Sequence, residues 1–191
     1  MENEVRSKNK LSVYQMAVTA LMAALMCVLC PLSIPIGPIP VSLSIFIILF
    51  SVYILGTRLG VLSYVIYLLL GVAGLPVFSG GEGGIGKLIG PTGGYLIGFI
   101  FLALIAGIFI EKGRSKIWLS VVGMLIGLFV DYLLGTAWFV ISMKTTVAYA
   151  LSVCVVPFIP IDLAKILIVV AIGPVLRKGL NKAGLIQNTA N

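Results

Sequence analysis

The stretch VVPFIPIDLAKILIVV, residues 155–170, decides the fold class of this chain. It is apolar except for Asp162 and Lys165, and an apolar run of this kind predicts a helix inside a bilayer. A charge within a span costs roughly 2.5–3.5 kcal/mol on insertion scales, so charged residues there usually line a site. The i, i+3 spacing puts both side chains on one helix face, where they can neutralise each other. Two interpretations remain open: a ligand pocket, or a structural ion pair.

The composition extends this conclusion to the whole chain. Of its 191 residues, 60% are hydrophobic and 10% are charged, and the mean hydropathy is +1.20. A soluble domain carries about a quarter charged residues, so this chain is predicted to be an all-α integral membrane protein. The net charge of +7 is distributed in short clusters between apolar runs. That placement is typical of charges that orient a membrane protein, and it argues against a nucleic-acid partner.

Six apolar segments are candidates for transmembrane helices, at roughly residues 12–30, 42–56, 59–74, 93–110, 117–141 and 155–176. Four prolines between residues 31 and 40 prevent a continuous helix from joining the first two segments. We therefore expect a single six-helix membrane domain over residues 1–191, surrounded by lipid. Its expected connections are an N-terminal tail at 1–11, a glycine-rich outer loop at 75–92 and a C-terminal tail at 177–191.

Lysine and arginine are distributed unequally between the two ends of these segments. With the N-terminus placed in the cytoplasm, the basic residues on the inner side are Arg6, Lys8, Lys10, Arg58, Lys112, Arg114, Lys116, Arg177, Lys178 and Lys182. Only Lys87 and Lys144 fall on the outer side, and Lys165 lies within a span. This bias predicts a multi-pass protein of the cell membrane with both termini in the cytoplasm. The connections at 31–40, 75–92 and 142–154 then share the outer face.

The segment GGEGGIGKLIGPTGG, residues 80–94, matches two nucleotide-binding spacings by chance, the dinucleotide-binding G-x-G-x-x-G at Gly81, Gly83 and Gly86 and the P-loop. Gly81, Gly86 and Lys87 have P-loop spacing, but Leu88 stands where a P-loop needs Ser or Thr, and no α/β domain fits in the chain. Glycine permits positive φ and close backbone approach, so the segment can fold over a pocket as a lid. A simple flexible connector is the alternative. Glu82 is the only acidic residue on the predicted outer face.

Asp131 is the third charged residue inside a predicted span, and no basic residue lies within one helical turn of it. It is either protonated or directed into the same cavity, and pocket and structural roles both remain open. Its neighbour Tyr132 can pack in the core or cover a ring. Cys27 and Cys30 form a C-x-x-C, interpreted as small apolar side chains rather than a redox or metal site. The chain has no histidine, and we expect no metal and no cofactor.

The first predicted helix carries a face of small residues, Ala17, Ala20, Ala23 and Ala24, in which Ala20 and Ala24 have small-x-x-x-small spacing. In lipid such a face lets another helix approach closely. The approaching helix belongs either to this bundle or to a partner protein.

The run GLPVFSGGEGGIGKLIGPTGGYLIGF, residues 74–99, resembles the signature of the BioY family, the biotin-specific S subunits of energy-coupling factor transporters. The resemblance extends over nearly the whole chain. IPIGPIPVSLS (34–44) resembles the family's first outer loop, YLLGTAWF (132–139) its fifth helix, and PFIPIDLAKI (157–166) its sixth. The glycine loop and the D-x-x-K pair together are the specific part of the match.

This resemblance implies a substrate-binding subunit that performs no chemistry and uses no catalytic residue. Biotin would bind near the outer surface, under the first and third outer loops, and would cross the membrane with a separate module. The alanine-rich first helix would dock on that module's transmembrane coupling subunit, itself bound to two ATPase subunits, and Ala20 and Ala24 match this role. The implied location is a prokaryotic plasma membrane.

The ureido ring of biotin carries two N–H donors and one carbonyl acceptor, and Asp162 with Lys165 supplies a matching acceptor and donor. The valerate carboxylate would point toward the glycine loop, where Glu82 would repel it unless protonated or turned outward. The expected ligand-binding residues are Asp162, Lys165, Glu82, Gly83, Gly84, Ser44, Tyr95, Tyr132 and Asp131. Two of them depart from the family pattern: Ser44 stands where Gln is usual, and Glu82 replaces a small or amide residue.

Two alternatives are kept. One is an S subunit or solitary carrier for a different small vitamin, because both departures lie at the expected pocket. An intramembrane enzyme using Asp131 and Asp162 is the other. It is disfavoured because the chain has no histidine and no serine or cysteine next to a plausible base.

Overall fold

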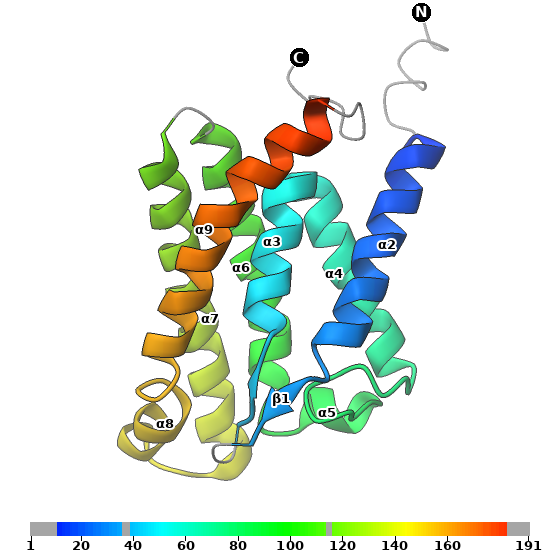
Figure 1. Ribbon diagram of the computed structural model, residues 1–191. Coiled ribbons are helices and arrows are strands. Elements are labelled where there is room, and N and C mark those ends of the chain that lie inside the picture. Colours follow the sequence, from blue (N-terminus) through cyan, green and yellow to red (C-terminus); the bar gives the residue numbers. More distant parts are fainter. Residues whose placement is uncertain (1–10, 36–38, 114–115, 183–191) are drawn as a thin grey trace, which may run out of the picture.

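The computed structural model describes residues 11–35, 39–113 and 116–182 (Figure 1). This part of the chain is mostly helical. Its longer helices are α2 (Val13–Leu29), α3 (Ser44–Leu55), α4 (Thr57–Val72), α6 (Gly93–Lys112), α7 (Ile117–Met143) and α9 (Ile159–Lys182). Two short helices, α5 (Ile85–Ile89) and α8 (Val147–Cys154), and a hairpin of β1 (Ser33–Ile34) and β2 (Val41–Ser42) lie between them.

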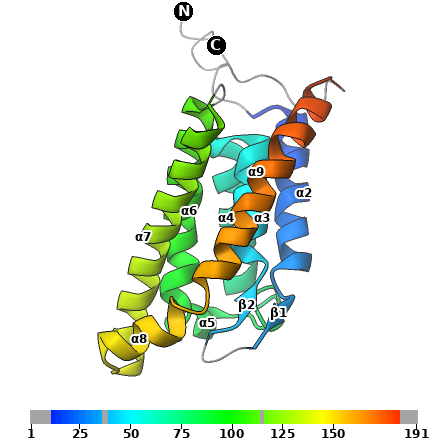
Figure 2. The ribbon, with the colours of Figure 1, turned by 60° about the vertical axis from the view of Figure 1, so that its left-hand side comes forward.

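The longer helices run alternately up and down in one bundle (Figures 1 and 2). The first residues of α2 and the last residues of α9 lie at one end, together with the α3–α4 connection, the end of α6 and the start of α7. We call this the terminal end. The β1–β2 hairpin, α5 and α8 lie at the opposite end, which we call the loop end.

Three helices are long and apolar enough to cross a membrane, namely α6, α7 and α9. The helices α2, α3 and α4 are apolar but have 17 residues or fewer. Helix α3 lies deepest in the bundle: of its 12 residues, all but Phe46 and Phe50 are buried. A helix shielded by its neighbours does not itself have to match the thickness of the hydrocarbon layer.

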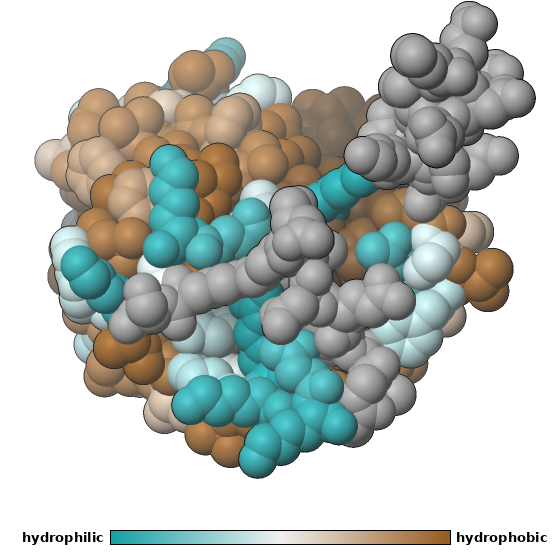
Figure 3. Space-filling view, turned by 90° about the horizontal axis from the view of Figure 1, so that it is seen from above, coloured by the Kyte–Doolittle hydropathy of each residue, from teal (hydrophilic) through white to brown (hydrophobic). Residues whose placement is uncertain are grey.

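The surface fits a membrane environment. Large exposed apolar side chains occur on every long helix except the enclosed α3, among them Leu21, Leu69, Phe101, Phe129 and Leu167. Figure 3 shows that hydrophilic residues gather at the terminal end, with hydrophobic residues around much of its edge. The described basic residues of the predicted inner side belong to helix ends there: Arg58, Lys112, Lys116, Arg177, Lys178 and Lys182.

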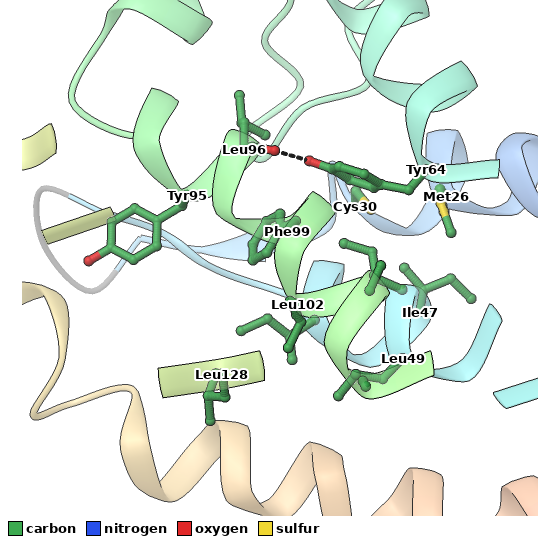
Figure 4. Close-up of a cluster of buried hydrophobic side chains, with 14 of the residues drawn as sticks. Met26, Cys30, Ile47, Leu49, Tyr64, Tyr95, Leu96, Phe99, Leu102 and Leu128 are labelled. Atoms are coloured by element: carbon green, nitrogen blue, oxygen red, sulfur yellow. Dashed lines mark hydrogen bonds between the residues drawn. The ribbon is translucent and has the colours of Figure 1, made fainter. Parts of the chain in front are cut away.

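The tightest helix pair is α6 and α7, which meet through glycines. A side chain at Gly94 would strike Trp138, one at Gly98 would strike Asp131, and one at Gly135 would strike the ring of Tyr95. Small residues at such a crossing let two backbones approach closely in lipid. Tyr95, Phe99 and Leu102 of α6 then form part of the buried core, with Leu128 of α7 nearby (Figure 4).

The sequence correctly predicts a mostly helical chain with candidate membrane spans: each of the six apolar segments contains a helix, and three of these helices are long and apolar enough to cross a membrane. The loop-end elements were not predicted: α5 interrupts the expected loop at 75–92, and α8 lies in the expected connection at 142–154. The hairpin lies in the connection at 31–40 and extends to Ser42, which was expected to begin the second helix. Helix α9 continues to Lys182, so it includes the first residues of the expected C-terminal tail at 177–191. Most of the tail at 1–11, Arg6, Lys8, Lys10, Arg114 and residues 183–191 lie outside the described residues.

We expect Gly135→Leu to destabilise the α6–α7 pair, because the new side chain would overlap the Tyr95 ring. Overpacking of this kind costs about 1–3 kcal/mol. Thermal unfolding of the detergent-purified protein measures the effect. Ala137→Leu is the matched control, since Ala137 is exposed on the same helix. Equal unfolding temperatures for the two variants would contradict the described packing.

Candidate ligand-binding site

A buried ion pair lies at the start of α9. Lys165 Nζ is 2.7 Å from Asp162 Oδ1, and the i, i+3 spacing places both on one helix face as predicted. Asp162 has no exposed surface and Lys165 is 8% exposed. The aspartate lies in the first turn of α9, where the helix dipole favours a negative charge. Pro160 is tolerated beside it because a first-turn residue has no intrahelical partner for its backbone nitrogen.

Two other elements add hydrogen bonds to this pair. Lys165 Nζ donates to the carbonyl oxygen of Ser42 in β2 at 2.8 Å. The Tyr132 hydroxyl, from α7, donates to Asp162 Oδ2 at 2.7 Å. The ion pair therefore joins α9 to the first hairpin and to α7. These partners matter because an unpaired charge in this position would be strongly destabilising.

The pair faces a cavity at the loop end of the bundle. Six of the expected ligand-binding residues line it: Ser44, Tyr95, Asp131, Tyr132, Asp162 and Lys165. The remaining lining residues are Ile39, Pro40, Ser42, Ile45, Tyr67, Ser79, Thr92, Leu96, Phe99, Cys154 and Phe158. This mixture of apolar walls and a few convergent polar groups is typical of a small-molecule site.

The cavity holds about 60 Å³. Small-molecule sites generally begin at about 300 Å³, so a ligand of vitamin size requires the lining to move apart. The lining outside the long helices belongs to the loop end and includes Ile39, Pro40, Ser42 and Ser79.

Asp131 lies near the middle of α7 and has no exposed surface. Neither of its carboxyl oxygens has a hydrogen-bond partner among the described residues. Buried polar groups are almost always paired, so this carboxyl calls for an explanation.

The aromatic residues of the site are held by their own hydrogen bonds. The Tyr95 hydroxyl lies 3.3 Å from Thr136 Oγ1, and the Tyr67 hydroxyl donates to the Val77 carbonyl at 3.0 Å. Trp138 lies outside the cavity lining, and its Nε1 donates to the Gly90 carbonyl at 2.9 Å. That bond attaches the glycine segment to α7.

Three expected ligand-binding residues, Glu82, Gly83 and Gly84, are not among the cavity lining. The Glu82 side chain is 59% exposed and pairs with Lys87 Nζ at 2.9 Å, so it is turned outward. Both glycines are required by the backbone. A side chain at Gly83 would strike the Leu75 carbonyl, and Gly84 has a φ of +88°. Their expected contribution is therefore to the shape of the loop.

Residues that the sequence did not single out also belong to the site. Ser42 contributes its backbone carbonyl, which no side-chain pattern reveals. Thr92 lines the cavity, and its buried Oγ1 has no hydrogen-bond partner among the described residues. Thr92 could have been singled out from the sequence, because it is a polar residue between Pro91 and Gly93, the first residue of α6.

A second hollow of about 550 Å³ lies between α7 and α8 and is lined almost entirely by apolar side chains, such as Phe129, Leu133 and Leu151. It offers almost no polar surface to orient a ligand, and several of its side chains belong to the exposed apolar set. We therefore assign the candidate site to the smaller cavity around Asp162.

On α2, Ala20 and Ala24 are exposed, whereas Ala23 is buried against the bundle. Ala20 and Ala24 therefore point away from the described bundle, whereas Ala23 of the same predicted face does not. The exposure of Ala20 and Ala24 supports contact with a partner protein rather than packing inside the bundle.

Comparison with known proteins identifies the family of this chain. The family model described as "BioY family" matches residues 3–182. A protein of Thermotoga maritima named "Biotin transporter BioY" is 40% identical over 165 residues, which cover 86% of this chain and 96% of the relative. A Pyrococcus horikoshii protein named "Probable biotin transporter BioY" is 40% identical over 151 residues, covering 79% and 88%.

A solved structure is similar along nearly the whole chain. It is the crystal structure of the S-component for biotin from an ECF-type ABC transporter, with a TM-score of 0.79 and 30% identity. The match covers 93% of this chain and 95% of that one. These relatives are transport proteins, so the interpretation as an intramembrane enzyme is set aside. The chain belongs to the BioY family.

Proposed function

We propose that this chain is the biotin-binding S component of an ATP-driven uptake transporter. The observation that carries the proposal is the buried Asp162–Lys165 pair at the cavity. A desolvated acceptor beside a desolvated donor is suited to a small polar ring with N–H and C=O groups. Because two relatives are named as biotin transporters, we take biotin as the ligand and its ureido ring as the group that contacts the pair.

The hydrogen-bond capacity of the pair supports this ligand. A lysine ammonium has three donors, and Lys165 uses two of them, on Asp162 and the Ser42 carbonyl. A carboxylate has about four acceptor positions, and Asp162 uses two, for Lys165 and Tyr132. One donor and about two acceptor positions therefore remain for a ligand. A ureido carbonyl and one ureido N–H can use them.

The loop-end segments are the proposed lid over biotin. The first connection and the glycine segment are linked, because the Gly80 N–H donates to the Pro31 carbonyl at 3.2 Å. The hairpin is also attached to the site through Lys165 and Ser42. Opening of these segments would admit the ligand to the small cavity. With both termini in the cytoplasm, as the positive-inside bias indicates, the lid faces the exterior of a prokaryotic cell.

The exposed alanine face of α2 is the proposed docking surface for the coupling module. Helices in lipid associate through close packing of small residues, and Ala20 and Ala24 provide such a surface outside this bundle. The module would comprise a transmembrane coupling subunit and two ATPase subunits. These partners would supply the energy for transport, since the sequence contains no genuine ATP-binding motif.

We expect Asp162→Asn and Lys165→Ala each to weaken biotin binding at least about tenfold, or ~1.4 kcal/mol. Each change leaves the other member of the pair with an uncompensated buried group. Calorimetric titration of the purified variants measures the effect. Lys178→Ala, at the exposed far end of the same helix, is the matched control. If both site variants bind biotin like the wild type, the pair is structural.

We expect the double variant Ala20→Trp, Ala24→Trp to bind biotin normally but to transport none. Two indole rings on α2 would prevent the close approach of a partner helix without touching the cavity. Uptake of labelled biotin by cells that express the coupling module measures transport. Ala137→Trp, on exposed α7, is the control and should retain uptake. Normal uptake in the double variant would remove this face from the coupling mechanism.

A further inference from the structure

Asp131 is a buried acid at the cavity that the proposed contacts of Asp162 and Lys165 do not use. It has no exposed surface and lines the same cavity, but it belongs to α7 rather than to α9. Both of its oxygens lack a hydrogen-bond partner among the described residues. The backbone of α6 leaves room for it at Gly98, where any side chain would strike Oδ1.

The polar groups around Asp131 are already engaged with other partners. The hydroxyl of Tyr64 donates to the Leu96 carbonyl, and that of Tyr132 donates to Asp162. The Tyr95 hydroxyl lies within hydrogen-bond distance of Thr136 and of the Cys154 carbonyl.

The basic residue of the described cavity lining, Lys165, is engaged with Asp162 and the Ser42 carbonyl. No salt bridge joins Asp131 to a basic residue in the described ranges. A molecule in the cavity is therefore the available partner for the Asp131 carboxyl.

The environment of Asp131 selects the neutral carboxylic acid. An isolated carboxylate buried in an apolar medium without a cation is far costlier than the acid form. The charged Asp162 on α9 adds a like charge at the same cavity. A neutral carboxyl group has one O–H donor and a carbonyl acceptor side by side.

The ureido ring has two equivalent edges. Each edge presents one N–H donor beside one lone pair of the shared carbonyl oxygen. Lys165 and Asp162, a donor beside an acceptor, match one edge. A neutral carboxylic acid is also a donor beside an acceptor, and it matches the other.

We propose that Asp131, as a neutral acid, pairs with the second edge of the ureido ring through two hydrogen bonds. Its carbonyl oxygen accepts the second N–H, and its O–H donates to the ureido carbonyl. The ring is then recognised on both edges, by an ion pair from α9 and by an acid from α7. This inference rests on the proposed function and assigns the site a preference for cyclic ureas with both nitrogens unsubstituted.

The first test combines two variants with two ligands. Asp131→Asn keeps a donor and an acceptor and should bind biotin within about threefold of the wild type, whereas Asp131→Ala should lose at least about tenfold. The ligands are biotin and its two analogues methylated on one ureido nitrogen. In Asp131→Ala, the analogue methylated on the Asp131 side should lose little further affinity. If Asp131→Ala weakens all three ligands by the same factor, the residue is structural and the proposal is wrong.

A second measurement does not depend on the folding of Asp131→Ala. Infrared difference spectra of the wild type with and without biotin should show a shift of a carboxylic-acid carbonyl band. Asp131→Asn should lack that band. Absence of the shift in the wild type, or its persistence in Asp131→Asn, would overturn the proposal.

These outcomes separate the inference from the proposed function. If the folded wild type does not bind biotin, both fail. If it binds biotin and Asp162→Asn weakens binding while Asp131→Ala does not, only the role of Asp131 is rejected.

Discussion

The buried ion pair of Asp162 and Lys165 is the interaction on which the rest of the structure around the site depends. Two charges in a membrane-embedded helix are stable only when each has partners, and the partners come from separate parts of the chain. The Ser42 carbonyl brings the first hairpin to α9, and the Tyr132 hydroxyl brings α7. The groups that stabilise the pair thus also form the cavity beside it.

The α6–α7 crossing provides the second wall of the cavity. Glycines at the contact let Tyr95 and Asp131 occupy the space between the helices, so close packing and the polar lining have one origin. Trp138 then connects this wall to the glycine segment through the Gly90 carbonyl. The loop-end segments are consequently attached to the long helices at defined points, the glycine segment to α7 and the hairpin to α9.

The helices and the charged core of the site follow from the sequence, because apolar length and an intramembrane D-x-x-K spacing are local signals. The loop end was predictable only in part. Glycine density indicated an unusual backbone, but it did not show that Glu82 turns outward to Lys87 or that Thr92 reaches the cavity. The role of Ser42 depends on a backbone carbonyl brought from more than a hundred residues away, which no local pattern contains.

The central claim is that a cavity built around one buried ion pair recognises biotin. Calorimetric titration of the detergent-purified wild type with biotin, followed by competition with other water-soluble vitamins, tests it most directly. The account predicts saturable binding of one biotin per chain that the other vitamins do not displace. Absence of biotin binding to folded protein, or displacement of biotin by a different vitamin at equal concentration, would contradict it.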